Sequence, residues 1–135
     1  MKPLIDLTER QCAFLDEVRY AVVATLDADG GIQQTVVWFI REGDQLLFST
    51  GAHSVKAGNL RRSPAISLTV EDGARYLTVS GSAALEPLDV GLRLRLAVRY
   101  LGPERAAEWV RRRPGVERVT VRIIVRRVYG QGMVG

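Results

Sequence analysis

The feature that most constrains the fold is a pair of apolar, β-branched segments joined by a short glycine turn. Tyr20–Leu26 (YAVVATL) and Ile32–Ile40 (IQQTVVWFI) have the composition of strands, and Asp27–Gly31 between them contains the Asp-Gly pair that is typical of hairpins. A second turn, Arg41–Gln45, leads into the apolar segment Leu46–Ser49. Together these segments predict a three-stranded antiparallel meander.

Three more strand-like segments follow, Ala65–Val70, Tyr76–Glu86 and Val116–Tyr129. In the last of them valine and isoleucine alternate with mostly polar residues, which predicts one buried and one exposed face. Gly81 lies inside a strand, where glycine is destabilising unless it forms a bulge or a close backbone approach. Six strands with helices inserted at three places predict a small antiparallel barrel with helices at its ends and side.

Helices are expected near the start of the chain and before the last strand. Thr8 and Gln11 have the spacing of a capping box, which predicts a helix over Thr8–Arg19. Its apolar face would consist of Cys12, Leu15 and Val18. Asp89 can cap a second helix, whose apolar face would consist of Val90, Leu94, Ala97 and Leu101. Pro103 would begin a third helix that ends at Arg113, with Trp109 as a packing residue.

The length, composition and net charge of the chain limit the class of protein to which it can belong. At 135 residues we expect one domain, 1–135. No run of about 18 apolar residues and no signal-peptide pattern occurs, so we expect a cytoplasmic protein without a membrane partner. One cysteine and one histidine argue against an internal disulfide and against a Cys- or His-based metal centre. A net charge of +4, almost all from arginine, suits phosphate or carboxylate ligands, but it would also suit nucleic acid.

Residues 46–70 form the stretch with the most chemistry: a strand, a small-residue turn, a short basic helix and a second strand. The polar candidates in it are Ser49, Thr50, Ser54, Lys56 and Asn59. Hydroxyls and backbone N–H groups at a helix start, with a lysine one turn later, are a common phosphate site. A surface connector with solvated basic residues fits equally well, because the spacing matches no P-loop. Spacing alone leaves both interpretations open.

The run Val36–Ile40 is apolar on both faces, unlike a strand that has one face in water. A barrel wall that also packs against a partner subunit or a ring-shaped ligand would explain it.

Four local strings, in this order and spacing, resemble one known family. They are Leu15–Asp29, the strand Thr35–Phe39, the segment Phe48–Gly51 with Ser54, Lys56, Asn59, Leu60 and Pro64, and the strand Val79–Ala83. The chain resembles the split β-barrel flavin and deazaflavin oxidoreductases related to pyridoxamine 5′-phosphate oxidase, and within them the small enzymes that use coenzyme F420. The resemblance covers nearly the whole chain.

This resemblance implies a mainly β, α+β fold: a six-stranded antiparallel split barrel with peripheral helices. It also implies a homodimer with two cofactor sites at the subunit interface. The residues that it places near the cofactor phosphate and ribityl chain are Ser49, Thr50, Ser54, Lys56 and Asn59. The residues that it places along the tricyclic ring are Val36, Val37 and Trp38.

The chain departs from the family pattern at several of these positions. The family often has basic residues where this chain has Ala52, Val55 and Gly58, and a proline where it has Val36. The resemblance therefore requires other cations at the phosphate. The candidates are His53, Arg61, Arg62 and an arginine of the partner.

The implied activity is transfer of a hydride from reduced coenzyme F420 to a conjugated small molecule such as an enone, a quinone or a tetrapyrrole. The cofactor carries that chemistry, so no catalytic residue is assigned, and Arg75 and Tyr76 are the candidates for the substrate side. Alternatives are an FMN-dependent oxidase or reductase and a non-catalytic flavin or haem carrier. A nucleic-acid-binding barrel is disfavoured, because Trp38, Tyr76 and Tyr129 alone could stack on bases.

Overall fold

The computed structural model describes residues 5–112 and 117–132. Short helices and an antiparallel sheet alternate along the chain. The elements are α1 (Glu9–Asp16), β1 (Ala21–Leu26), β2 (Ile32–Val37), β3 (Ile40–Glu42), β4 (Gln45–Gly51), α2 (Val55–Arg62), β5 (Ala65–Glu71), β6 (Tyr76–Pro87), α3 (Val90–Leu101), α4 (Pro103–Arg112) and β7 (Arg118–Gln131). No helix in these ranges is both long and apolar enough to cross a membrane.

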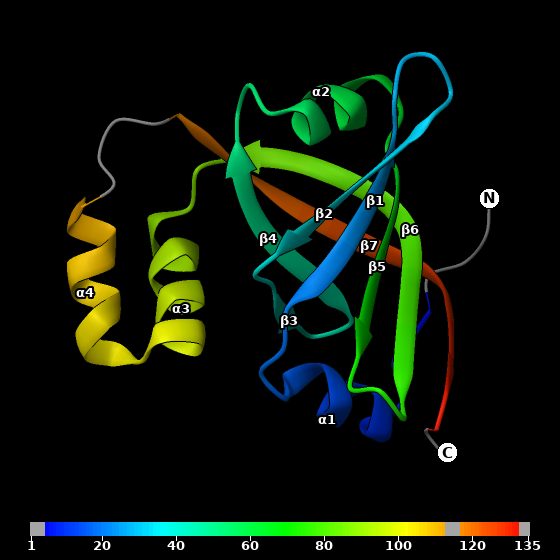
Figure 1. Ribbon diagram of the computed structural model, residues 1–135, viewed down its shortest axis with the longest axis horizontal. Helices are drawn as coiled ribbons and strands as arrows, with labels where there is room; N and C mark the ends of the chain where they lie inside the picture. The colour runs from blue at the N-terminus through cyan, green and yellow to red at the C-terminus, as the bar shows by residue number, and fades with distance from the viewer. Residues whose placement is uncertain (1–4, 113–116, 133–135) are drawn as a thin grey trace.

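The strands form one curved sheet in the order β2-β1-β5-β6-β7-β4-β3. Every pairing is antiparallel, and the sheet stays open between β2 and β3, so the fold is the expected split-barrel type. Figure 1 shows α1 at one end of the sheet, α2 at the other, and the α3–α4 hairpin to one side, beside β4. The interior is filled by a single large apolar cluster that includes Phe14, Phe39, Phe48, Leu68 and Ile123.

The described ranges contain seven strands where the sequence predicted six. The expected strand Ile32–Ile40 is two strands, because the chain leaves the sheet at Trp38 and Phe39. The hydroxyl of Tyr100, from α3, takes the place of a neighbouring strand there. It accepts from the backbone N–H of Phe39 at 3.2 Å and donates to the carbonyl of Arg19 at 2.7 Å.

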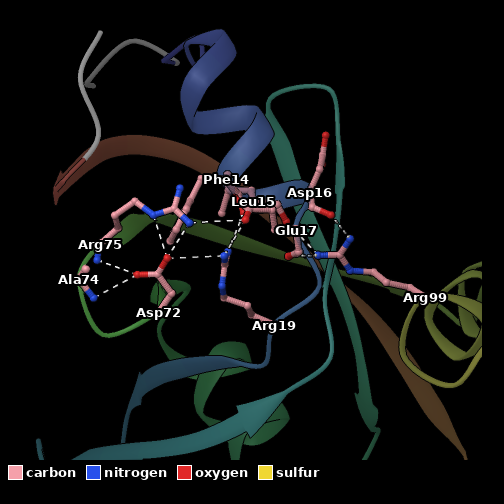
Figure 2. Close-up of polar contacts among 9 residues, drawn as sticks. All are labelled: Phe14, Leu15, Asp16, Glu17, Arg19, Asp72, Ala74, Arg75 and Arg99. Atoms are coloured by element: carbon pink, nitrogen blue, oxygen red, sulfur yellow. Dashed lines mark hydrogen bonds and ion pairs between the residues drawn. The ribbon is translucent and has the colours of Figure 1, made fainter.

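The first helix begins as predicted but ends earlier. The capping box of Thr8 and Gln11 is confirmed, whereas the helix stops at Asp16 and leaves Val18 56% exposed. The cause is Arg99, 83 positions away along the chain, which donates to the carbonyls of Leu15, Asp16 and Glu17 at 2.9, 2.9 and 3.1 Å. Figure 2 shows this guanidinium at the helix end. It satisfies carbonyls that the helix itself leaves without partners.

The predicted apolar faces of the helices were only partly right. In α1 Leu15 is buried, but Phe14 is buried beside it and Cys12 is only partly covered. In α3 the cap by Asp89 is confirmed, whereas Val90 and Leu94 are exposed and Leu92 and Leu96 are buried. The α3 face is fixed by a second cluster with Leu47 of β4, which the helix period alone does not reveal.

The last strand is confirmed, with Val121, Ile123 and Val125 buried on one face. It is paired from Arg118 to Gln131, two residues beyond the predicted end at Tyr129. The expected strand start at Val116 and the expected helix end at Arg113 lie outside the described residues.

The bulge predicted at Gly81 is present, and it generates a stability prediction. The β6–β7 register shifts between Ser80 and Gly81, and a Cβ on Gly81 would lie 1.9 Å from the carbonyl oxygen of Ile124. Gly81→Ala should therefore lower the free energy of unfolding by about 2–3 kcal/mol, because the two strands must separate. Gly58→Ala is the control: its Cβ meets nothing within 4 Å, and alanine in a helix should add about 0.5–1 kcal/mol. Urea denaturation measures both, and equal effects of the two substitutions would contradict the prediction.

Candidate functional site

A cavity of about 400 Å³ lies where β2, β4, α2 and the start of β7 meet the α3–α4 hairpin. It is lined by Val36, Val37, Trp38, Ser49, Thr50, Gly51, Lys56, Arg93, Leu96, Trp109 and Arg118. Six of the residues singled out in the sequence thus share one cavity, although they come from three separate elements. They are Val36, Val37, Trp38, Ser49, Thr50 and Lys56.

One end of the cavity is built from hydroxyl groups and a lysine. Strand β4 ends at Gly51, and Ser54 caps α2 by accepting from the backbone N–H of Ala57 at 3.2 Å. The Ser54 hydroxyl lies 3.1 Å from that of Thr50, and Lys56 Nζ donates to the Thr50 hydroxyl at 3.4 Å. The strand end and the first turn of α2 therefore present their polar groups together.

Arg118 brings a second positive charge to this end. It lies opposite Gly51 in the β4–β7 pairing, and it donates from Nε to the Ser49 hydroxyl at 2.9 Å and from Nη2 to the Ser49 carbonyl at 3.1 Å. Burial lowers the pKa of Lys56, and the charge of Arg118 lowers it further. Among the described residues no carboxylate forms an ion pair with Lys56. A lysine that is not paired with a carboxylate, with a second cation beside it, favours an anionic ligand.

The other walls of the cavity are apolar and aromatic. Trp38 stacks on Tyr100 with ring centroids 5.1 Å apart, and Tyr100 stacks on Tyr20 at 5.8 Å. The ring of Trp109, from α4, has its centroid 5.3 Å from that of Trp38 and is tilted by 39° to it. Val36, at the edge of the sheet, is 64% exposed. A flat conjugated ring could pack against Trp38 and Trp109 and enter from the open side at Val36.

Two of the phosphate-side candidates lie outside the cavity lining. Ser54 is one of them, and its hydroxyl contacts that of the lining residue Thr50. Asn59 is buried and points toward β1: its amide nitrogen donates to Thr25 Oγ1 and to Asp27 Oδ1, both at 3.0 Å, and its oxygen accepts from Arg62 at 2.6 Å. In this structure Asn59 ties α2 to the first hairpin.

The substrate-side candidates Arg75 and Tyr76 are not brought to the cavity. They lie at the turn between β5 and β6, at the end of the sheet covered by α1 (Figure 1). Arg75 forms an ion pair with Asp72 at 2.6 Å, and its guanidinium lies over the ring of Phe14 (Figure 2). Backbone and side-chain hydrogen bonds from Arg75 lower the pKa of Asp72. This cluster fastens the turn to α1.

Of the cations expected to compensate for Ala52, Val55 and Gly58, His53, Arg61 and Arg62 do not line the cavity, whereas Arg118 does. His53 is exposed beside Glu117, at 3.2 Å, and Arg61 donates to the Ala52 carbonyl at 2.7 Å. Arg62 is bound to Asn59. Sequence reasoning missed Arg118, Arg93 and the place of Trp109 in the lining. No local signal marks Arg118, because its contact with Ser49 spans 69 positions.

A second cavity, of about 470 Å³, lies on the outer face of the sheet between β1, β2, β5, β6 and β7. It is slightly larger, and its lining combines apolar residues such as Ala24, Leu26, Ile32 and Ala65 with the hydroxyls of Thr25, Ser67 and Ser80 and the cations Arg126 and Arg127. It differs from the first cavity in having no aromatic side chain among its lining residues. Among the described residues, no group of His, Cys, Asp and Glu side chains is arranged to hold a metal ion.

Comparison with known proteins shows the family of the chain. A family model described as pyridoxamine 5′-phosphate oxidase matches residues 7–131. An F420H(2)-dependent biliverdin reductase of Mycobacterium tuberculosis (strain CDC 1551 / Oshkosh) is 33% identical over 130 residues, which cover 92% of this chain and 88% of the relative.

Solved structures of similar fold include the conserved hypothetical protein Rv2991 from Mycobacterium tuberculosis. It has a TM-score of 0.79 and 28% identity over 94% of this chain and 85% of its own. A structure titled F420 reductase has a TM-score of 0.75 and 26% identity over 91% of this chain and 98% of its own.

The lowered pKa of Lys56 generates a prediction about pH and stability. The lysine is harder to charge in the folded protein than in the unfolded chain, so the folded state carries a penalty while both forms are protonated. The penalty declines as pH rises from the folded pKa towards the unfolded pKa. Lys56→Met should therefore raise the free energy of unfolding at pH 7, and this gain should shrink towards about pH 10. Urea denaturation at a series of pH values measures it, and a gain that stays constant with pH would count against the pKa shift.

Proposed function

We propose an F420-dependent reductase function for this chain, which belongs to the pyridoxamine 5′-phosphate oxidase family. In the proposed reaction a hydride passes from reduced coenzyme F420 to a conjugated small molecule such as an enone, a quinone or a tetrapyrrole. The names of two similar proteins, an F420H(2)-dependent biliverdin reductase and an F420 reductase, support the choice of cofactor. The cytoplasm, where such reduced cofactors are regenerated, is the compartment that this function implies.

The observation that carries the proposal is the juxtaposition of Lys56 and Arg118 with the Trp38 wall in one cavity. Lys56 is half-buried and forms no ion pair with a carboxylate of the described residues; it donates to the Thr50 hydroxyl, and Arg118 donates to the Ser49 hydroxyl. These groups fit a phosphate that is linked to a flat ring. When bound, the reduced deazaflavin supplies the hydride.

The protein's own residues would bind and orient rather than exchange protons. Lys56 and Arg118 would hold the phosphate by charge-assisted hydrogen bonds, with Ser49 and Thr50 donating beside them. Val36, Val37 and Trp38 would lie along the ring, and Trp38 would exclude water from one side. Such positioning is a large part of what a protein contributes to hydride transfer.

FMN is the alternative cofactor, because it also joins a tricyclic ring to a phosphate through a ribityl chain. The described lining has hydroxyl and cationic groups that would accept either phosphate. Titration of the purified protein with F420 and FMN side by side decides between them. Tight binding of either without turnover of any acceptor would instead indicate a flavin or haem carrier.

Substitution of Lys56 is the most direct test of the cofactor proposal. Lys56→Ala should weaken F420 binding by roughly 1.5–3 kcal/mol, the usual loss for a charge-assisted contact. Arg10→Ala is the control, since it removes one positive charge from the exposed side of α1, away from the cavity. Fluorescence titration gives both dissociation constants. An unchanged Kd in Lys56→Ala would exclude this lysine from the site.

We further propose that the protein is a homodimer with its cofactor sites at the interface. Support comes from an apolar patch on the outer face of β1 and β2, formed by Val22, Leu26, Ile32 and Val36. Val22 pairs with Val36 and Leu26 pairs with Ile32, so the four side chains lie on one face. Exposed patches of this kind commonly mark protein–protein contacts. Val36 also lines the cavity, which would place a partner next to the ring wall.

Sedimentation should give twice the mass of the chain. Ile32 is 68% exposed in the single chain, and Ile32→Glu should yield a monomer, because the dimer would bury an unpaired carboxylate. Val90→Glu, on the exposed face of α3, should leave the dimer intact. A wild-type monomer that still binds cofactor would overturn the interface model.

A further inference from the structure

The cavity contains a second arginine, its third cation, whose role the phosphate end does not explain. Arg93 of α3 lines the cavity together with Leu96 of the same helix. It comes from the α3–α4 hairpin, whereas Lys56 and Arg118 come from α2 and β7 on the sheet side. Arg93 therefore lies in one wall of the cavity, and Lys56 and Arg118 lie in another.

Arg93 has no protein anion to neutralise it within the described part of the chain. Its Nε is buried without a hydrogen-bond partner, and no ion pair includes it. Other arginines of the fold are engaged: Arg41 with Asp16 at 2.6 Å, and Arg122 with Glu86 at 3.0 Å. Leaving a guanidinium donor buried and unpaired costs free energy, so a cavity-lining arginine in this state is suited to an incoming acceptor.

The aromatic neighbour of Arg93 indicates what else the ligand contains. The guanidinium lies over the ring of Trp109, 5.2 Å from its centroid, and Trp109 leans on Trp38. This cation–π contact with Trp109 uses the face of the ring and leaves terminal N–H groups of the guanidinium able to donate to a carboxylate. A carboxylate attached to a flat conjugated system would meet the arginine and the tryptophans together.

The hairpin that carries Arg93 is fastened to the barrel. Arg99, six residues after Arg93 in α3, donates to three carbonyls at the end of α1, and the Tyr100 hydroxyl accepts from the backbone N–H of Phe39. Figure 2 shows the Arg99 contacts. The hairpin therefore holds Arg93 at a defined place in the wall.

We propose that Arg93 recognises a carboxylate of the acceptor, so that the preferred substrates are planar conjugated molecules with an acidic side chain. This inference rests on the proposed reductase function and names the substrate class of that same site. Arg93 contributes charge and orientation to acceptor binding, while Lys56 and Arg118 bind the cofactor phosphate. Arg93 and the phosphate residues should consequently be separable by experiment.

The test compares Arg93→Gln with wild type on two probes: biliverdin, a tetrapyrrole with two propionate carboxylates, and its dimethyl ester, in which both charges are removed. Arg95→Gln is the matched control, because Arg95 lies on the same helix with an exposed side chain that pairs with Glu42 outside the cavity. For each protein we would measure the F420 Kd by fluorescence, KM and kcat for both acceptors, and the acceptor Kd from quenching of tryptophan fluorescence.

With biliverdin, Arg93→Gln should raise KM and the acceptor Kd roughly 10- to 100-fold, the loss expected for one charge-assisted contact. With the dimethyl ester, wild type and Arg93→Gln should agree, and the F420 Kd should stay unchanged in both variants. Arg95→Gln should behave as wild type throughout.

Equal losses on the acid and the ester would overturn the inference, because they would mark a packing role for Arg93. A raised F420 Kd would also overturn it and would assign Arg93 to the anionic tail of the cofactor. If wild type shows no turnover, the proposed function fails, and the acceptor Kd values still decide the inference. A wild-type protein that binds acid and ester equally would contradict it.

Discussion

The structure depends above all on the pairing of β7 with two strands at once. One edge of β7 pairs with β6 along almost its whole length, and the other edge pairs with β4 from Gln45–Ile124 to Gly51–Arg118. The long strand can curve to serve both neighbours because Gly81 allows the two backbones to approach at the bulge. The same pairing sets Arg118 beside Ser49. The curvature of the sheet and the position of Arg118 in the candidate site therefore have one origin.

Much of this arrangement could be predicted from local sequence. Strand composition, Asp-Gly at the first hairpin, the capping box of Thr8 and the interior glycine each reflect chemistry within a few residues of chain. The strand–turn–helix around Thr50 and Lys56 was predictable for the same reason, and the structure places both residues in the cavity. What local patterns miss is long-range partner choice: Arg118 meets Ser49 across 69 positions, and the buried face of α3 is selected by Leu47.

Asn59 and Arg75 show that local patterns can also suggest a binding residue where the fold uses it for another purpose. Both are polar residues at positions that suggest ligand binding, and in this structure both are satisfied by the protein itself. Asn59 is held by Thr25 and Asp27, and Arg75 is held by Asp72 over Phe14. A polar side chain in sequence does not reveal whether the fold supplies its partner. Lys56 and Arg93 differ because, among the described residues, neither is paired with a carboxylate.

The two sides of the cavity are held in place by different parts of the fold. One side belongs to the sheet and the other to the α3–α4 hairpin. The end with Thr50 and Arg118 is built on sheet pairing and borders the large core cluster, so it cannot move without disturbing the barrel. The hairpin side stands on a smaller cluster of Leu47, Leu92 and Leu96, together with the polar contacts of Arg99 and Tyr100. Both helices lie beside the sheet rather than within it (Figure 1), and replacing Arg93 or Trp109 removes no residue of either core cluster. Because the large core cluster does not include the hairpin, substitutions there can change that wall of the cavity while the groups around Thr50 and Lys56 keep their geometry.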